Sequence, residues 1–234
     1  RLMKQALEAQ PGLALRQEVV EGLIVEGGRA AGVSCASGLV YRAAAVVLTT
    51  GTFLRGVIHL GPAQTTGGRM GELSAERLSA GLEALGLEVG RLKTGTPPRV
   101  NRRSIAVERM KVQPGDPQPR PFSFENASVS YLQLPCFMTA TNPRTHEIIL
   151  RNLDRAPLYT GQIKSVGPRY CPSVETKVVR FADRQWHSVY LEPEGLDTLE
   201  MYCNGISTSL PQDVQEEMVH SIIGLENAEI MRYG

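Results

Sequence analysis

The residues best suited to chemistry in this chain are gathered in the run GPRYCPSVETKVVRF, from Gly167 to Phe181. Within this run Cys171 lies between two prolines and close in sequence to Arg169 and Lys177. Neighbouring positive charge lowers the pKa of a thiol and makes it a nucleophile, and proline favours extended backbone on either side. The run therefore predicts a reactive thiol on a stiff loop. The alternative interpretation is a small buried hydrophobe beside an ordinary solvated basic face.

A second run, KTGTPPR at 93–99, offers a cation, two hydroxyls and an arginine on a loop stiffened by paired prolines. Such a loop suits an anionic or polar ligand such as a phosphate, and its candidate substrate-binding residues are Lys93, Thr94 and Arg99. The alternative is a turn without a ligand, because threonine, glycine and proline are all common in turns.

A third candidate site follows the continuous apolar run at 44–48, which is typical of a buried strand. The run ends in Thr49, Thr50, Gly51 and Thr52, whose hydroxyls and backbone N–H groups could approach a ligand closely. The glycine-rich segment GGRMGE at 67–72 predicts a flexible loop facing a ligand, because glycine permits close contacts that a Cβ would block. A plain strand followed by a turn is the alternative.

Composition narrows the class of protein. With 234 residues, 42% of them hydrophobic, the chain can bury a substantial core, and its net charge of +1 creates no general attraction to nucleic acid or membrane. The four cysteines form no CxxC pair and no histidine lies at metal-ligand spacing, which argues against a zinc site and a disulfide framework and favours the reducing cytoplasm. No apolar stretch approaches the roughly 20 residues of a membrane span. We treat the four histidines, which are far apart in sequence, as structural or surface residues.

Hydrophobic periodicity and turn residues predict a mixed α/β chain with two domains and a boundary near residue 95. The chain begins at Arg1 and ends at MRYG in mid-pattern, so we expect an internal piece of a longer protein. The predicted helices are at 2–9, 74–85 and 211–223, and the predicted strands at 13–20, 23–26, 30–35, 39–43, 44–48, 87–92 and 188–193.

Nine runs of the chain, in order, closely resemble the MnmG/GidA family of flavoproteins of bacterial tRNA wobble-uridine modification, whose mitochondrial counterpart is MTO. The resemblance covers essentially the whole chain, and GPRYCPS and KTGTPPR are its most family-specific parts. The matching runs are VVLTTGTFLRG, GGRMGE, VGRLKTGTPPR, PFSF, LPCF, TNPRTHEII, GPRYCPSVETKVVRFADR, LEPEG and NGISTSLP.

The resemblance implies part of a glutathione-reductase-type FAD/NAD(P)-binding domain with an inserted second α/β domain. In that interpretation 1–95 belongs to the FAD-binding domain without its N-terminal Rossmann unit, 96–210 is the inserted NAD-binding-like domain, and 211–234 returns toward the FAD domain. The chain contains no GxGxxG fingerprint, so we expect it to bind FAD poorly by itself.

The resemblance also implies site residues. The FAD contacts would be Val19, Thr49, Gly51, Thr52 and Ser74, with Ala75 as the alternative to Ser74. Cys171 matches a family cysteine thought to take part in catalysis. The implied NAD-binding stretch comprises Gly167, Pro168, Arg169, Tyr170, Cys171, Pro172, Ser173, Val174, Glu175, Thr176, Lys177, Val178, Val179, Arg180 and Phe181.

The implied reaction adds a carboxymethylaminomethyl or aminomethyl group at C5 of the wobble uridine of tRNA. It uses FAD, NADH, methylene-tetrahydrofolate as carbon donor, glycine or ammonium as amine donor, and the GTPase partner MnmE. A thiolate could add to C6 of the uracil ring while reduced flavin carries the methylene group. The family also implies a homodimer that forms a heterotetramer with MnmE, in the cytoplasm and away from membranes, and no metal.

Two other functions remain open. The related folate-dependent tRNA uridine methyltransferases share the flavin fold and the tRNA substrate but lack a GPRYCPS-type insert, which favours the MnmG/GidA interpretation. The chain could instead be a non-catalytic module that binds tRNA phosphates or a second copy of itself. Its contact surface would be a basic strip formed by Arg99, Arg102, Arg103, Arg109 and Lys111.

Overall fold

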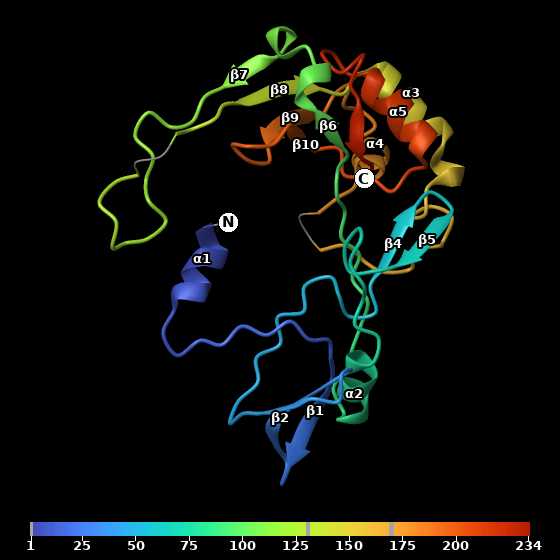
Figure 1. Ribbon diagram of the computed structural model, residues 1–234. Coiled ribbons are helices and arrows are strands. Elements are labelled where there is room, and N and C mark those ends of the chain that lie inside the picture. The colour runs from blue at the N-terminus through green and yellow to red at the C-terminus, as the bar shows by residue number, and fades with distance from the viewer. Residues whose placement is uncertain (1, 130–131, 169–170) are drawn as a thin grey trace. The chain divides into compact units, whose positions relative to one another are not determined.

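The computed structural model of the chain describes residues 2–129, 132–168 and 171–234. The chain forms two compact units, whose elements can be followed in Figure 1. Unit 1 comprises Arg1–Ile58 and Gln64–Gly90, and unit 2 comprises His59–Ala63 and Arg91–Gly234. Among the described residues, none of the helices is long and apolar enough to cross a membrane.

Unit 1 contains a three-stranded antiparallel sheet in the order β1-β2-β3, against which one helix packs. That helix, α2, buries Leu78 and Leu82 and ends at Gly86, which has the left-handed φ of 83° that glycine accepts without strain. The elements are α1 (Leu2–Ala9), β1 (Val20–Glu26), β2 (Arg29–Cys35), β3 (Val40–Arg42) and α2 (Leu78–Ala84). The predicted helices and the strands near 23–26, 30–35 and 39–43 are thus confirmed, with shifted ends.

Three predicted strands are wrong. The apolar run 44–48 is not a strand, and the side chain of Val47 is 84% exposed. A continuous apolar run forms a buried strand only when a neighbouring strand and a covering layer are available, and β1 to β3 pair with one another instead. Residues 13–19 and 87–91 likewise form no strand.

Unit 2 is built on a six-stranded antiparallel sheet in the order β11-β6-β10-β9-β8-β7. Burial alternates along its central strands, so that Val189 and Leu191 of β9 and Met201 and Cys203 of β10 face the core. The strands are β6 (Arg99–Asn101), β7 (Lys111–Gln113), β8 (Cys136–Ala140), β9 (Ser188–Pro193), β10 (Glu200–Asn204) and β11 (Ile230–Arg232). The strand predicted at 188–193 is confirmed.

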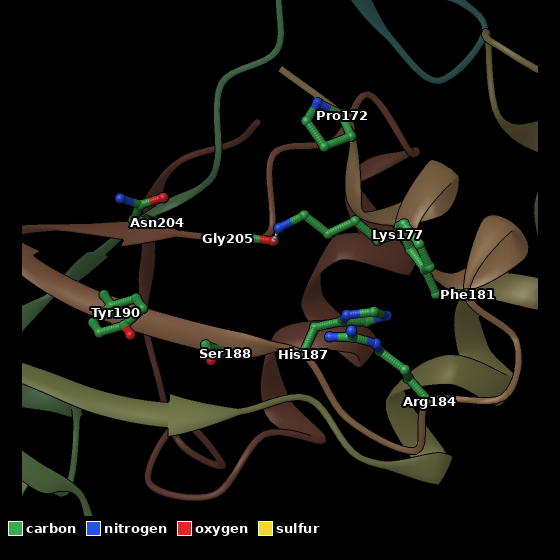
Figure 2. Close-up of a pocket in the computed structure, with 9 residues that line it drawn as sticks. All are labelled: Pro172, Lys177, Phe181, Arg184, His187, Ser188, Tyr190, Asn204 and Gly205. Carbon is green, nitrogen blue, oxygen red and sulfur yellow. Dashed lines mark hydrogen bonds between the residues drawn. The ribbon is translucent and has the colours of Figure 1, made fainter. Parts of the chain in front are cut away.

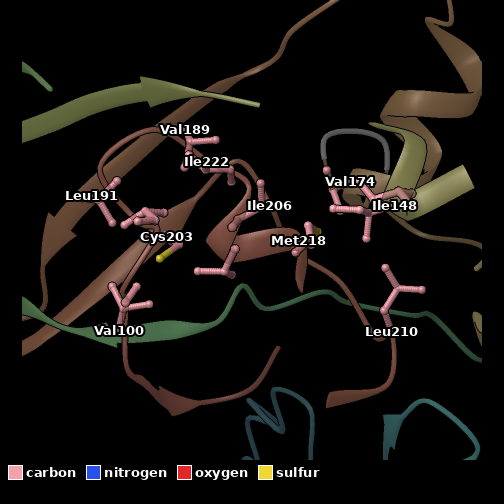
Figure 3. Packing of buried hydrophobic residues seen from close by; sticks show 14 of the residues in the cluster. Val100, Ile148, Val174, Val189, Leu191, Cys203, Ile206, Leu210, Met218 and Ile222 are labelled. Atoms are coloured by element: carbon pink, nitrogen blue, oxygen red, sulfur yellow. The ribbon is translucent and has the colours of Figure 1, made fainter. Parts of the chain in front are cut away.

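Three helices supply the other side of the unit 2 core, which Figure 3 shows at close range. Ile148 and Ile149 of α3, Val174 of α4 and Met218 of α5 are all buried with the inward residues of the sheet. The helical elements are α3 (Pro143–Arg151), α4 (Val174–Arg180) and α5 (Gln212–His220), with short 3-10 turns η1 (Arg102–Ser104), η2 (Val107–Arg109) and η3 (Leu153–Arg155). A further pair, β4 (Val57–Leu60) and β5 (Ala63–Thr66), forms a two-stranded sheet.

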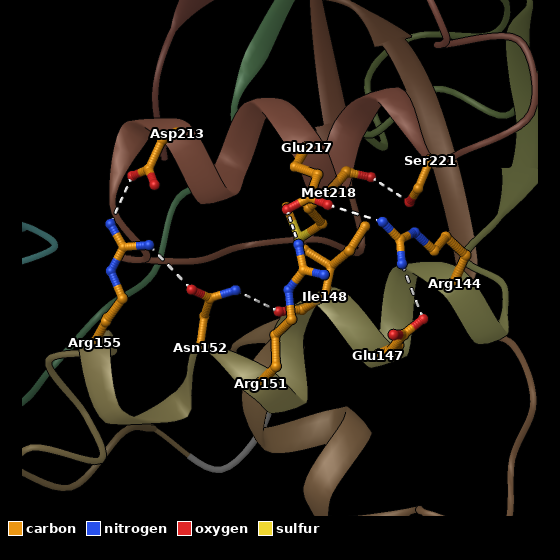
Figure 4. Close-up of polar contacts among 10 residues, drawn as sticks. All are labelled: Arg144, Glu147, Ile148, Arg151, Asn152, Arg155, Asp213, Glu217, Met218 and Ser221. Carbon is orange, nitrogen blue, oxygen red and sulfur yellow. Dashed lines mark hydrogen bonds and ion pairs between the residues drawn. The ribbon is translucent and has the colours of Figure 1, made fainter.

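Helix α3 shows how sequence sets an element's start. The Asn142 side chain accepts a hydrogen bond from the Thr145 backbone, the Thr145 hydroxyl accepts one from the Asn142 backbone, and Pro143 occupies the first turn. On its outer face Arg144 and Arg151 both pair with Glu217 of α5 (Figure 4). These contacts fix α3 against α5 at the surface while the isoleucines fix it beneath.

The units divide differently from the expected domains. The structural division falls at Gly90 and Arg91 rather than near 95, and 211–234 belongs to unit 2. The reason is packing: α5 contributes Val214, Met218 and Val219 to the unit 2 core, and β11 pairs with β6. The overall mixed α/β character is as expected.

Candidate functional site

The described part of the cysteine loop places Cys171 in a turn just before α4. The Cys171 backbone N–H donates to the Pro168 carbonyl over 3.1 Å, and the cysteine is half-buried. All four cysteines of the chain are free thiols. Arg169 and Tyr170 lie outside the described residues, so their expected roles stay predictions.

The start of α4 fastens this loop to the segment NGISTSLP at 204–211. Ser173 caps the helix by accepting from the Thr176 backbone, and the Val174 N–H donates to the Ser207 carbonyl over 2.7 Å. NGISTSLP is one of the nine runs that carry the family resemblance. The structure places it directly against the cysteine loop.

A buried carboxyl makes the same connection one residue further on. Glu175 is 1% exposed, and its Oε1 accepts from the Thr208 hydroxyl at 2.7 Å and from the Ser209 backbone at 3.4 Å. Its Oε2 is buried without a hydrogen-bond partner among the described residues. Buried polar atoms are nearly always bonded, and the Thr208 hydroxyl makes the shorter of the two hydrogen bonds to this carboxyl. The link between α4 and the segment 204–211 therefore depends strongly on that hydroxyl.

The run KTGTPPR lies beside both segments. The Lys93 N–H donates to the Val166 carbonyl at 3.2 Å, and a Cβ on Gly167 would lie 3.0 Å from Lys93 Cε. Thr96 forms an isolated bridge with Thr208. Three runs that are separate in sequence, at 93–99, 167–181 and 204–211, are therefore neighbours in unit 2. Thr94 is exposed.

Arg99 is engaged within the protein. Its guanidinium pairs with Glu194 at 2.9 Å and lies 4.8 Å from the centre of the Tyr202 ring. Burial raises the pKa of Tyr202, Arg99 lowers it, and the charges of Glu192 and Glu194 raise it further. Sequence reasoning missed Tyr202, whose ring Arg99 contacts on β10.

Beside α4 lies an open pocket of about 380 Å³, whose lining residues are shown in Figure 2. Lys177 reaches across from α4, and its Nζ donates to the Gly205 carbonyl over 2.8 Å. Burial lowers the pKa of Lys177. We expected Lys177 to serve the thiol of Cys171, whereas its ammonium is directed to this pocket edge. The lining residues are Pro172, Lys177, Phe181, Arg184, His187, Ser188, Tyr190, Asn204 and Gly205.

His187 is buried, in agreement with the structural role expected for the histidines, and it also lines the pocket. Its ring lies 5.3 Å from that of His146, and it is 8% exposed while lining the pocket. Burial lowers the pKa of His187, and the charges of His146, Lys177 and Arg184 lower it further. His146 and His187 are 41 positions apart in sequence, so no local pattern indicates that they pack together.

The expected flavin contacts of unit 1 also come together in part. The Thr52 hydroxyl donates to the Gly68 carbonyl at 2.6 Å, and the Ala75 N–H donates to the Phe53 carbonyl at 2.8 Å. The TTGT turn, with Gly51 at φ 54°, is thus bonded to the loop that carries GGRMGE, and Ser74 is next to the point of contact. A Cβ on Gly68 would lie 2.1 Å from the Phe53 ring, so this glycine is required by close packing. Thr49 is exposed.

Val19 lies just before β1 and is 46% exposed, and its carbonyl accepts from the Ala36 N–H at 2.9 Å. It belongs to the sheet region of unit 1 rather than to the TTGT turn. The proposed basic strip is partly neutralised, because Arg99 pairs with Glu194 and Arg109 with Glu226. Within the described residues no group of three or more histidine, cysteine or acidic side chains could hold a metal ion.

The chain matches one protein family along its whole length. The family model described as "Glucose inhibited division protein A" matches residues 1–234. A protein of Thermodesulfovibrio yellowstonii named "tRNA uridine 5-carboxymethylaminomethyl modification enzyme MnmG" is 51% identical over 232 residues, 99% of this chain and 37% of that protein. A protein of the same name from Streptococcus pyogenes is 52% identical over 236 residues, 100% of this chain and 37% of that protein.

A solved structure has the same fold. The structure of Aquifex aeolicus GidA in its form I crystal matches with a TM-score of 0.90 and 46% identity, covering 99% of this chain and 40% of that chain. The form II crystal matches with a TM-score of 0.89 and 44% identity, covering 99% and 38%. The chain therefore spans about 37% of the length of the curated relatives it matches.

Proposed function

The chain belongs to the glucose inhibited division protein A (GidA) family, and from that membership we propose that it acts as part of an enzyme that modifies the wobble uridine of tRNA at C5. The product is a carboxymethylaminomethyl or aminomethyl uridine. The observation that carries the proposal is the identity of 51% and 52% to proteins named as MnmG tRNA uridine modification enzymes, over at least 99% of this chain.

The geometry of unit 2 supports a reaction centre near Cys171. Three family-specific runs meet there, and the cysteine lies beside the start of α4, where Ser173 and Val174 hold the loop in place. In this proposal Cys171 gives up its proton and adds as a thiolate to C6 of uracil, which shifts the electron pair of the C5=C6 bond to C5 and makes C5 nucleophilic. The alternative role of Cys171 is to transfer a proton. Lys93, Thr94 and Arg99 would hold the substrate, with Arg99 first leaving Glu194.

The cofactors in the proposal are FAD and NADH, with methylene-tetrahydrofolate as carbon donor. The bonded pair of loops in unit 1 supports the proposed flavin contact, because the Thr52–Gly68 hydrogen bond holds the TTGT turn against the loop that carries GGRMGE and so brings the polar groups of both loops together. Val19, Thr49, Gly51 and Ser74 are the other proposed FAD contacts. FAD would supply redox chemistry and carry the methylene group.

NADH is proposed to bind along 167–181. The described part of that stretch contains a capped helix start at Ser173 and two basic side chains, Lys177 and Arg180, which suit a phosphate-bearing ligand. The further partners we propose are a GTPase of the MnmE type and a second copy of the protein, forming a homodimer and a heterotetramer, in the cytoplasm.

The test is nucleoside analysis of tRNA by mass spectrometry from cells that lack the gene. Loss of 5-carboxymethylaminomethyluridine and 5-aminomethyluridine derivatives, with 5-methyluridine retained, is the expected result. Loss of 5-methyluridine alone would support the methyltransferase function instead. Unchanged nucleosides would contradict both enzyme functions and favour the non-catalytic module. Measuring tRNA binding across a salt series would then test whether that module binds tRNA phosphates.

A further inference from the structure

The open pocket beside α4 combines positive charge with a buried imidazole nitrogen that has no hydrogen-bond partner among the described residues. Lys177 and Arg184 line it together with His187, and none of its lining residues is acidic. Neither Lys177 nor Arg184 forms an ion pair with a carboxylate among the described residues. Two cations gathered on one concave surface repel each other unless an anion joins them, so their position indicates the charge of a ligand.

His187 gives a second and independent indication. Its Nε2 atom is buried and has no hydrogen-bond partner among the described residues, although the side chain is more than nine-tenths buried. A buried imidazole nitrogen without a partner is costly, and a bound acceptor would remove that cost. In Figure 2 the His187 ring lies between the side chains of Lys177 and Arg184.

The rest of the pocket suits a nucleotide better than a bare ion. Phe181 and Tyr190 provide aromatic surface within the lining, and the Arg184 guanidinium lies 5.6 Å from the centre of the Phe181 ring. Aromatic rings beside cations are the usual surface for a base next to its phosphate. A volume of about 380 Å³ accommodates a phosphate with part of a nucleoside.

We propose that this pocket binds a phosphate group of a nucleotide ligand through Lys177, Arg184 and His187. The inference extends beyond the proposed NADH stretch, because Arg184 and His187 lie outside 167–181. Lys177 would share its ammonium between the Gly205 carbonyl and the phosphate. The phosphate could come from a dinucleotide or from RNA, and only this assignment of source rests on the proposed function.

The direct test is equilibrium binding of inorganic phosphate to the 234-residue chain. Isothermal titration calorimetry measures this binding directly and needs no reporter group at the pocket. We expect saturable binding of phosphate and of adenosine 5′-monophosphate and none of adenosine. Absence of saturable phosphate binding by calorimetry would overturn the proposal.

Two variants locate the site. Arg184→Gln removes one exposed pocket cation and should weaken phosphate binding about tenfold, whereas Arg120→Gln removes the same charge from an exposed position outside the pocket and should leave it unchanged. Equal affinity of the Arg184 variant and the native chain would overturn the assignment. His187→Gln should weaken binding least at high pH, because an anion favours the protonated imidazole.

Competition then distinguishes the two sources. NADH displacing phosphate, with no displacement by a uridine trinucleotide, assigns the pocket to the dinucleotide; the reverse assigns it to RNA. Both measurements are independent of tRNA modification. A failure of phosphate binding therefore contradicts the pocket, while normal phosphate binding with unchanged cellular nucleosides contradicts the proposed function.

Discussion

The Thr208 hydroxyl donates to Oε1 of the buried Glu175 over 2.7 Å, and this bond joins the segment 204–211 to the helix that follows Cys171. We predict that Thr208→Val destabilises the chain by about 1–3 kcal/mol, because the buried carboxyl loses its best donor. Urea unfolding measures the change. Thr160→Val is the matched control, since its hydroxyl makes only a 3.4 Å contact with the Pro157 carbonyl. Equal losses in the two variants would contradict this role for Thr208.

Gly205 is required by the turn at the pocket edge. Its φ is +105°, and a Cβ would lie 2.4 Å from the Ser188 carbonyl oxygen. We predict that Gly205→Ala destabilises the chain by more than about 1 kcal/mol, because alanine disfavours that φ and meets backbone. Gly195→Ala is the control, since its Cβ would make an ordinary 3.5 Å contact with Thr198. Thermal unfolding of both variants measures the difference in stability. An unfolding temperature of Gly205→Ala equal to that of the native chain would contradict the prediction.

The histidine cluster predicts a loss of stability in acid. Burial lowers the pKa of His146 and His187, and the charges of His146, Lys177 and Arg184 add to the effect at His187. The unfolded chain then binds more protons than the folded chain once the pH falls below about 6.5. Stability should be full above that pH and fall as the pH decreases below it. His59, whose pKa is lowered by burial and by Arg91, acts in the same direction.

Urea midpoints between pH 7.5 and 5.5 test this dependence. His187→Gln removes one titrating group, so the decline toward acid should become shallower. Native and variant chains with the same acid dependence would mean that His187 does not contribute.

Sequence alone predicted the segments that have local signals. The helix at 2–9 is bounded by Pro11 and Gly12, and strand 188–193 alternates in a clear period of two. The apolar run 44–48 failed because its state depends on a partner strand, which a local pattern does not contain. The helix predicted at 211–223 is present as α5, because its periodic pattern is local. Its packing in the unit 2 core was not predicted, because that depends on distant segments.

For the candidate site too, the local runs could be predicted from sequence and the contacts between them could not. GPRYCPS and KTGTPPR were recognised from residue types and NGISTSLP from the family resemblance, but their meeting through Val174, Ser207 and Glu175 follows from tertiary packing. Tyr202, Arg184 and His187 carried no signal in sequence, because single aromatic and basic residues on strands and turns are common. Their relevance comes from sharing a pocket or a charge neighbourhood.

The chain should bind FAD weakly by itself. The proposed flavin contacts of unit 1 rest on the TTGT turn, the bonded GGRMGE loop and Val19, and the chain contains no GxGxxG run to hold a pyrophosphate. We predict that the purified 234-residue chain is colourless. The measurement is the absorbance of the purified chain at about 450 nm, where oxidised flavins absorb. A stoichiometric yellow spectrum would contradict this prediction.

The central claim concerns Cys171, and tRNA nucleoside analysis with cysteine variants tests it most directly. Cells lacking the gene receive the full-length coding sequence with Cys171→Ser or, as the control, with Cys136→Ser, another half-buried free thiol. We predict that the Cys171→Ser variant leaves the tRNA without the modified wobble uridine, whereas the Cys136→Ser variant restores it. Full modification with Cys171→Ser would remove this thiol from the mechanism.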